Sequence, residues 1–214
     1  MKFVPHKLKT AQHQKGAALV VSLVLLAVVT LIGVTGMQNS TAELKMATAA
    51  QDHATAFAAA EAAMVQVEQQ LATLPPDREK LLSTCTGVGC FNKTCSQGLC
   101  FQGAYINVDS EFDCKVSDPT GKIKAIDFWS DSTLNIWKTS TRYKTIKIER
   151  LDANVKYITE FLCYVKRDSV TPFSGAAGEK NNGAPLFRIT TLAEGNGLRG
   201  RVMLQSTYKV LAGH

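Results

Sequence analysis

The feature that most constrains this chain is an uncharged apolar run, Ala17 to Met37, which lies close to its N-terminus. A helix of this length spans about 31 Å at roughly 1.5 Å per residue, which is about one bilayer hydrocarbon core. The hydroxyls within the run, Ser22, Thr30 and Thr35, can donate back to carbonyls of their own helix. The sequence therefore predicts a single N-terminal transmembrane helix.

A basic leader, residues 1–16, precedes the apolar run and holds four lysines and no acidic residue: Lys2, Lys7, Lys9 and Lys15. A secretory signal peptide is cut after its apolar region. Here the natural border is Gly16–Ala17, before that region, so cleavage there would leave the apolar segment at the N-terminus of the mature chain. The lysines favour a leader on the cytoplasmic side of the membrane.

The formal net charge of +6 is largely a property of the leader. Without its four lysines, 20 basic and 18 acidic residues remain, a net charge of +2. This balance is weak evidence for nucleic-acid binding, which favours a basic face on the folded domain. The length of 214 residues suits one membrane segment and one soluble domain.

A helical pattern continues well beyond the apolar run. Apolar residues recur at intervals of three and four, and an alanine-rich stretch over 47–63 favours helix: Phe57, Ala60, Met64, Val67, Leu71 and Leu74. Pro75 and Pro76 end the pattern. We expect one helix of nearly sixty residues whose amphipathic half packs on a sheet, with a partner helix as the alternative for that face. Gly33 and Gly36 mark either a weakened turn or a place that loosens or packs on another helix.

Strand-like patterns dominate after Pro76. We expect short or alternating strands over Tyr105–Val108, Lys122–Trp129, Thr141–Leu151, Val155–Lys166, Leu186–Leu192 and Arg201–Leu211. Asp152-Ala153-Asn154 and the Asn-Gly pair at 196–197 predict two hairpin turns, and residues 168–184 predict an exposed loop. The fold class is therefore α+β: a long N-terminal helix packed on an antiparallel sheet of four to six strands with disulfide-rich loops.

Six cysteines all follow the apolar run: Cys85, Cys90, Cys95, Cys100, Cys114 and Cys163. An even number on the exported side of a membrane favours disulfides in an oxidising compartment. The first four recur every five residues, which fits zinc poorly because zinc sites use CxxC pairs. Of the fifteen pairings that six cysteines allow, we favour local bridges within 85–100 and a bridge between Cys114 and Cys163.

Catalytic chemistry finds little support in the sequence. The mature part has two histidines, His53 and His214, neither near a nucleophile in sequence, and there is no GxxxxGK[ST] or GxGxxG motif. We expect no catalytic residue, metal or cofactor, although a carboxylate pair stays open. Aromatic and basic residues do mix over 128–147, including Trp129, Trp137, Arg142, Tyr143 and Lys144. Single-stranded nucleic acid is one interpretation, but ordinary strand faces are favoured, and we do not expect nucleic-acid binding.

The segment QKGAALVVSLVLLAVVTLIGVTGMQNSTAELKMA, followed by AFAAAEAAM, resembles the N-terminus of type IV pilins and, more narrowly, of the PilX family of minor pilins. The resemblance is strong over residues 14–64 and weaker at 204–208. It implies a type IV pilin-like fold, cleavage between Gly16 and Ala17 by a prepilin peptidase, and N-methylation of Ala17.

One departure from the pilin pattern bears on the position of the subunit. Major pilins carry a glutamate as the fifth mature residue, where this chain has Val21. That glutamate is thought to pair with the N-terminal amine of a neighbouring subunit, and the type II secretion pseudopilin GspK resembles the PilX-like pilins in lacking it. The resemblance therefore implies a subunit suited to the pilus tip, where no subunit lies ahead.

The resemblance implies a structural subunit of the tip or priming complex, which initiates pilus assembly and supports adhesion and twitching motility. Its expected partners are other minor pilins, the major pilin, a tip adhesin, the prepilin peptidase and the inner-membrane assembly platform. We expect it in the inner membrane with its domain in the periplasm, and then at the pilus tip on the cell surface. The alternatives are a type II secretion minor pseudopilin and a pilin that itself binds DNA or a surface ligand.

The expected organisation follows from these patterns. It comprises a cleaved leader over 1–16, a transmembrane and fibre-core helix over 17–37 and an amphipathic helix over 38–74. A cysteine-rich loop region over 75–121 and an antiparallel sheet region over 122–214 complete the chain.

Overall fold

The computed structural model describes residues 17–107, 114, 128–166, 183–195 and 200–211. By its internal contacts the chain divides into two compact units, residues 1–48 and residues 49–214. The two units are described separately below.

One helix, α1, runs from Ala17 to Thr73 over 57 residues, which confirms the prediction of a single long helix. Its last turn is extended by a bond from the Leu74 N–H to the carbonyl of Gln70, 2.9 Å long. Pro75 and Pro76 follow at once, and neither can donate the next backbone hydrogen bond. The helix therefore ends where the proline pair predicts.

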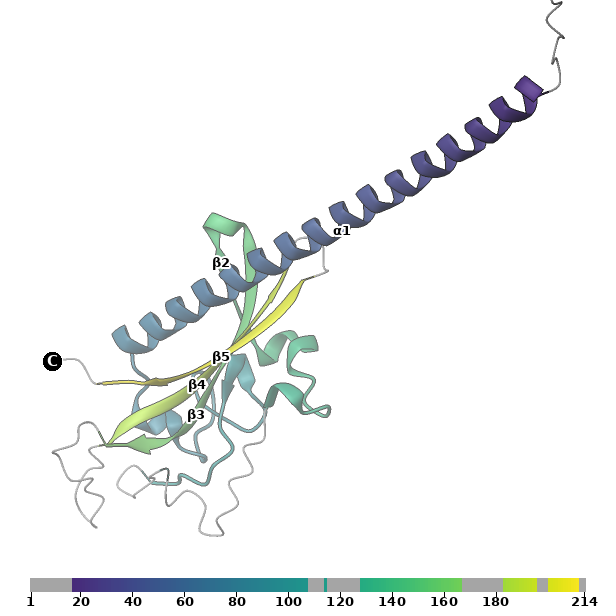
Figure 1. The fold of residues 1–214 in the computed structure, drawn as a ribbon. Coiled ribbons are helices and arrows are strands. Elements are labelled where there is room, and N and C mark those ends of the chain that lie inside the picture. The colour runs from purple at the N-terminus through teal and green to yellow at the C-terminus, as the bar shows by residue number, and fades with distance from the viewer. Residues whose placement is uncertain (1–16, 108–113, 115–127, 167–182, 196–199, 212–214) are drawn as a thin grey trace, which may run out of the picture. The chain divides into compact units, whose positions relative to one another are not determined.

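The second unit is built on a five-stranded mixed sheet (Figure 1). Its strands are β1 (Leu99–Cys100), β2 (Lys144–Ile148), β3 (Ala153–Val165), β4 (Ala184–Glu194) and β5 (Arg201–Lys209). β3 pairs with β4 and β4 with β5, all antiparallel. The other edge of β3 is shared by β2, antiparallel opposite residues 153–157, and β1, parallel opposite 159–160. The expected sheet is thus antiparallel except for the two-residue strand β1.

The second half of α1 lies across one face of this sheet (Figure 1). Four buried alanines, Ala56, Ala59, Ala60 and Ala63, form one cluster with side chains of β2 to β5. One turn further on, Val67 packs with Tyr157 and Ile189. Small side chains let the helix come close to the strands, and the Thr191 hydroxyl donates to the Ala60 carbonyl at 3.3 Å.

The prediction that the apolar stripe packs on the sheet is therefore confirmed for its central residues and wrong for the residues at its two ends. Ala60 and Val67 are buried, whereas Phe57 is 40% exposed and Leu74 is 82% exposed. The packed face is rotated towards the alanines, because a helix held this close to a sheet has no room for large side chains at every contact position.

The turn between β4 and β5 also approaches the helix closely. A Cβ placed on Gly200 would lie 2.9 Å from the His53 backbone nitrogen, and one on Gly195 would lie 3.0 Å from the Asp52 carbonyl oxygen. The Gly195 N–H donates to the Gly200 carbonyl at 2.7 Å, which closes the turn at its base. Glycine is required here because backbone meets backbone.

The opposite face of the sheet is covered by short 3-10 helices. Ile158 follows Tyr157 on β3 and so points to the other face, where it packs with Cys95, Cys100, Phe128 and Ile136. The covering segments are η2 (Ser96–Gly98), η3 (Phe128–Ser130), η4 (Ile136–Lys138) and η5 (Ser140–Arg142). Two further 3-10 helices are η1 (Arg78–Leu81) and η6 (Glu149–Leu151).

Both predicted hairpins are confirmed in their pairing. The first turn comes slightly earlier than expected, over η6 and Asp152, whose φ of 45° reverses the chain. The prediction of a strand at Tyr105–Val108 is wrong over 105–107, because Tyr105 is a fully buried anchor whose carbonyl accepts from Ser83 at 2.6 Å. Val108 lies outside the described residues.

The remaining expectations fall largely on residues that the structure does not describe. Of the predicted strand Lys122–Trp129, only 128 and 129 are described, and both lie in η3 instead. The Asn-Gly turn at 196–197 and residues 168–182 of the expected loop lie outside the described residues. Gly183 precedes β4 and Ala184 begins it.

Candidate assembly surface

The most distinctive surface of this chain is the first part of α1. From Ala18 to Thr48, every side chain that the structure describes is exposed. The run includes large aliphatic side chains such as Leu26, which is 68% exposed. Its best 18-residue window has a mean hydropathy of 2.8, and by length and composition the helix could cross a membrane. A monomer in water would not keep so large an apolar surface exposed.

The side-chain hydroxyls of the apolar run, residues 17–37, are satisfied by the helix itself. Ser22 donates to the Leu19 carbonyl at 2.9 Å, and Thr30 donates to the Ala27 carbonyl at 2.9 Å. The Thr35 hydroxyl lies 3.0 Å from the carbonyls of both Leu31 and Ile32. These bonds confirm the prediction that the hydroxyls bond back. The helix can therefore enter an apolar environment without leaving a hydroxyl unpaired.

The predicted processing site lies at the border of the described residues. Gly16 is outside them, and Ala17 is the first residue of α1. Val21, one turn later, is 57% exposed, and there is no acidic residue in the first turn of the helix. The first charged residues after Lys15 are Glu43 and Lys45. Cleavage after Gly16 and methylation of Ala17 stay predictions.

The two helix glycines have open space around them. A Cβ added to Gly33 or Gly36 would have nothing within 4 Å outside the local helix backbone. Contacts within the described part of this chain therefore do not explain either glycine. Loosening of the helix and packing against another helix both stay open as interpretations.

The six candidate cysteines form three disulfides in the structure: Cys85–Cys90, Cys95–Cys100 and Cys114–Cys163. Local bridges within 85–100 and the Cys114–Cys163 bridge agree with our expectation, which left open how the first four cysteines pair. The first two bridges each close a short loop, and the third spans 49 residues. The loop region is less peripheral than its composition suggests, because Cys90, Phe91, Cys95, Cys100 and Phe101 are all buried.

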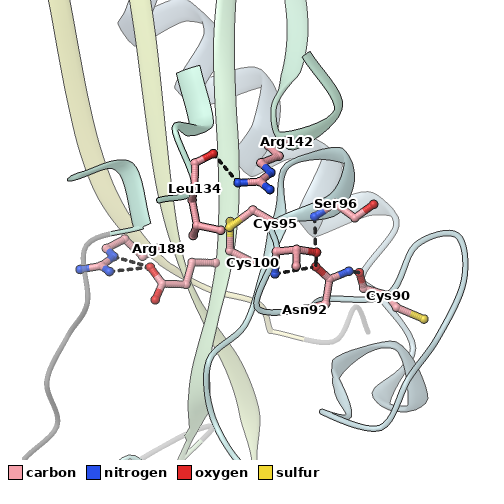
Figure 2. The surroundings of a disulfide bond; sticks show 10 residues. Cys90, Asn92, Cys95, Ser96, Cys100, Leu134, Arg142 and Arg188 are labelled. Carbon is pink, nitrogen blue, oxygen red and sulfur yellow. Dashed lines mark hydrogen bonds and ion pairs between the residues drawn. A yellow bond between two sulfur atoms is a disulfide. The ribbon is translucent and has the colours of Figure 1, made fainter. Parts of the chain in front are cut away.

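Asn92 organises the chain between the first two bridges (Figure 2). Its Oδ1 accepts from the Thr94 and Ser96 N–H groups, each at 3.1 Å, and from the Thr94 hydroxyl at 2.8 Å. Gly98, at φ 74°, then brings the loop against the sheet, where a Cβ would lie 3.0 Å from the Tyr157 carbonyl oxygen. The cysteine loop is thus held to the edge of β3 as part of the folded domain.

The sheet offers one long edge for a partner. β5 pairs with β4 on one side and with no other strand among the residues that the structure describes. Arg201 begins the strand and Lys209 ends it, and charged ends of this kind discourage indiscriminate pairing. An extended segment of another protein could add to such an edge.

The mixed aromatic and basic stretch forms a strand only from Lys144, where β2 begins, and 3-10 turns before it. Trp129 and Trp137 lie in η3 and η4 and line a pocket of about 350 Å³ with Leu192, Arg201 and Met203. Tyr143 lies 6.5 Å from Trp137 between ring centroids, and Lys156 lies over the Tyr143 ring at 5.3 Å. The prediction of ordinary strand faces is therefore wrong for Trp129 and Trp137, which lie in 3-10 turns over the sheet, and right for Lys144, which begins β2.

A turn between η3 and η4 carries a perturbed carboxylate. The Asp131 side chain accepts from the Thr133 hydroxyl at 2.6 Å and from its N–H at 2.7 Å. These bonds hold the pKa of Asp131 below its usual value. The carboxylate is partly exposed and stabilises a turn.

A nearly buried ion pair lies on the face of the sheet opposite α1. Arg188 of β4 donates through Nη2 and Nε to Glu160 of β3, at 2.6 and 2.7 Å (Figure 2). No sequence pattern predicts this pair, because only the strand register brings the two residues opposite one another.

Among the described residues there is no group of three His, Cys, Asp or Glu side chains that could hold a metal ion.

Comparison with known families identifies the first part of the chain. Residues 15–65 match the family model described as PilX N-terminal, which spans the apolar run and reaches into the alanine-rich part of α1. No curated protein and no solved structure matches the chain.

Proposed function

We infer, because residues 15–65 belong to the PilX N-terminal family, that this chain is a minor pilin of the type IV pilus. That match is the observation that carries the proposal. It includes the Gly16–Ala17 border and the whole apolar run, which are the parts that a pilin needs for export and assembly. The protein acts as a structural subunit rather than an enzyme.

The apolar part of α1 serves two environments in succession. Before assembly it spans the inner membrane with the domain on the periplasmic side. In the fibre the same surface packs against the helices of neighbouring subunits. The internally bonded hydroxyls of Ser22, Thr30 and Thr35 support this role, since they leave the helix surface apolar in both settings.

Processing of the leader is the first step that can be tested. We propose that a prepilin peptidase cuts between Gly16 and Ala17 and that Ala17 is then N-methylated. Intact-mass and N-terminal peptide spectrometry of the protein from membranes would show a chain that begins with N-methylalanine at 17. In a strain with an inactive peptidase the leader should remain. A mature N-terminus at any other residue would contradict the proposal.

The position of the subunit is the second step. Val21 cannot make the carboxylate contact to a subunit ahead, so we propose that the protein lies at the pilus tip and primes assembly. Gold-labelled antibody should mark one end of sheared pili. Val21→Glu should allow entry into the shaft and spread the label, whereas the neutral control Val21→Gln should leave it at the end. Even labelling of the wild-type shaft would overturn the tip position.

The soluble domain provides the contacts that define the tip complex. Its partners are other minor pilins, the major pilin and a tip adhesin, and the free edge of β5 is a surface at which one of them could add a strand. Deletion of the gene should reduce piliation, surface adhesion and twitching motility together. Normal piliation and motility in the deletion strain would contradict a priming role.

Two other functions share parts of this support. A minor pseudopilin of type II secretion would use the same N-terminal segment, and GspK resembles this chain in lacking an acidic residue at the position of Val21. Deletion would then abolish protein secretion and leave pili intact. A pilin that binds a ligand itself is favoured by the pocket that Trp129 and Trp137 line. In that case, substitution of these tryptophans would reduce surface or DNA binding while piliation stayed normal.

A further inference from the structure

A pocket of about 440 Å³ lies between the last turns of α1, the cysteine loop and the edge of β3 that β1 and β2 share. Its volume is within the range of pockets that bind small molecules. Every residue of its lining belongs to the second unit and lies in a continuously described stretch of the chain. The pocket combines apolar walls with a small group of polar side chains at one end.

The walls of the pocket are mainly aliphatic. Val67, Leu71 and Leu74 follow one another at intervals of four and three, so they lie on one face of α1. Phe91 and Leu99 of the cysteine loop complete the apolar lining on the other side. Val67 is 2% exposed and Leu74 is 82% exposed. The apolar surface therefore runs from the interior of the domain out to solvent, which suits a ligand with an extended apolar body.

The polar part of the lining includes two hydroxyl side chains of β3, Tyr157 and Thr159. They are two positions apart on the strand and so point to the same face, where Tyr157 packs with Val67. They are 8% and 3% exposed, and neither hydroxyl makes a hydrogen bond to another described residue. Burial raises the pKa of Tyr157, so its hydroxyl stays protonated and can donate to a ligand.

Lys144 brings a positive charge to the same end of the pocket, and the rest of this lining is uncharged. It lies directly opposite Tyr157 in the antiparallel pairing of β2 with β3. Residues paired in this way have Cβ atoms roughly 5 Å apart, on the same face of the sheet. Lys144 is exposed and makes no ion pair to another described residue. An ammonium group and two hydroxyls are thus available side by side at the end of an aliphatic pocket.

We propose that this pocket binds an aliphatic monocarboxylate, with its carboxylate beside Lys144, Tyr157 and Thr159 and its chain along Leu71 and Leu74. The single positive charge of the lining complements a single negative charge. The two carboxylate oxygens can accept from an ammonium group and from a hydroxyl at the same time. A phosphate group carries up to two negative charges and would be only partly neutralised. The proposal concerns the soluble domain alone and does not rest on the proposed function in the pilus.

The first test measures binding to the full chain in lipid nanodiscs by titration calorimetry, with empty nanodiscs as the blank. Hexanoate is the probe, and hexanamide is its uncharged control at constant ionic strength. Hexanoate should bind about tenfold or more tightly than hexanamide, as a hydrogen bond to a charged group predicts. Each methylene added from butyrate to hexanoate should tighten binding about fourfold, because it is buried against the aliphatic wall. Absence of saturable hexanoate binding would overturn the proposal.

Two lysines of β2 provide a matched pair of variants. Lys144→Gln should weaken hexanoate binding about tenfold or more. Lys147→Gln removes the same charge from the same strand, but residue 147 points to the other face, where it pairs with Glu149 and Asp152. This control should bind hexanoate as the wild type does. Equal affinities of the two variants would contradict the site, and both side chains are exposed, so neither change should prevent folding.

Tyr157→Phe tests the hydroxyl separately from the charge. It should weaken hexanoate binding roughly two- to tenfold, as loss of a hydrogen bond predicts, and leave the weaker binding of hexanamide less affected. Thermal melting without ligand shows whether the variant is folded. An unchanged hexanoate affinity in folded Tyr157→Phe would remove the hydroxyl from the site.

The second test asks whether a protein segment occupies the pocket instead. Benzoylphenylalanine in place of Leu74, at the exposed end of the pocket, should crosslink to other proteins in cells no more strongly than the same residue in place of Val65. Val65 is an exposed residue of α1 outside the lining. A dominant crosslink from 74 to one protein, reduced by Lys144→Gln, would overturn the free carboxylate as occupant and assign the pocket to an acidic segment of that protein.

Discussion

The two halves of α1 use apolar residues in opposite ways. In residues 17–48 large aliphatic side chains are exposed, whereas from residue 49 onwards the buried positions are mainly alanines, Ala56, Ala59, Ala60 and Ala63. Hydrophobicity alone would rank the first half as the core. The difference shows that a side chain of α1 is buried when it is small enough to fit against the sheet. The first half is apolar because of an environment outside the chain.

The comparison also separates stability from assembly. Contacts of the second half with the sheet hold the domain together, so changes there should alter the free energy of unfolding. Changes in the first half should leave the domain intact and alter its insertion or packing with other subunits. The predictions below test this separation, from the largest expected effect to the smallest.

Removing the Cys114–Cys163 bridge with the double change to alanine should destabilise the domain most. The bridge spans 49 residues, and loss of so long a loop constraint costs about 4 kcal/mol against about 2 for a short loop. Thermal melting of the full chain in detergent measures the effect, and the double change of Cys85 and Cys90 to alanine is the matched control. The helical circular dichroism signal from residues 17–48 should persist when the domain unfolds. Loss of that signal together with the domain would contradict the separation of the two halves of α1.

Ala60→Leu should destabilise the domain by up to about 3 kcal/mol, because Ala60 is fully buried under the sheet and a larger side chain forces the helix away. Ala58→Leu adds the same atoms at an exposed position of the same helix. It should change stability by less than about 0.5 kcal/mol. Equal melting temperatures for the two variants would contradict the packed face described here.

The same substitution, glycine to alanine, should have opposite signs in the two regions. Gly200→Ala places a Cβ against the backbone of His53, and should destabilise the domain by about 1–2 kcal/mol. Gly33→Ala meets open space and should strengthen the helix by about 1 kcal/mol. Domain melting and the helix content of the detergent-bound chain measure the two effects. A loss of domain stability in Gly33→Ala would show that the two regions are not independent.

Leu26→Ala should have the smallest effect on the domain, within about 0.5 kcal/mol, because Leu26 makes no buried contact in this chain. Under the proposed function it should still lower the amount of protein recovered in sheared pili, because less apolar surface would be available to neighbouring helices. Quantitative mass spectrometry of pili against membranes measures that ratio. An unchanged ratio would remove Leu26 from the assembly surface.

Periodic and compositional features of the fold could be predicted from the sequence. The 57-residue helix, its end before Pro75 and both hairpins follow from local patterns. Local bridging among the first four cysteines was also expected, but the spacing left their partners open, since each lies five residues from the next. These features depend on neighbours along the chain, which a sequence displays directly.

Features that depend on contacts between parts of the chain that are distant in sequence could not be predicted. Nothing local distinguishes Gly200 from any other turn glycine until the helix backbone is placed beside it. The two-residue strand β1 forms only because the cysteine loop docks on β3. The Arg78 guanidinium lies over the Tyr164 ring only because the fold brings a turn and a distant strand together.

The hydroxyls that bond back within α1 have a consequence for the transfer of the helix between lipid and protein surroundings. Because Ser22, Thr30 and Thr35 keep acceptors in their own helix, exchange between lipid and protein surroundings makes and breaks no hydrogen bond. The two states then differ mainly in dispersion contacts, which are individually small. Such a helix is close to thermodynamically neutral towards its surroundings, so under the proposed function it would leave or re-enter the membrane with little change in free energy.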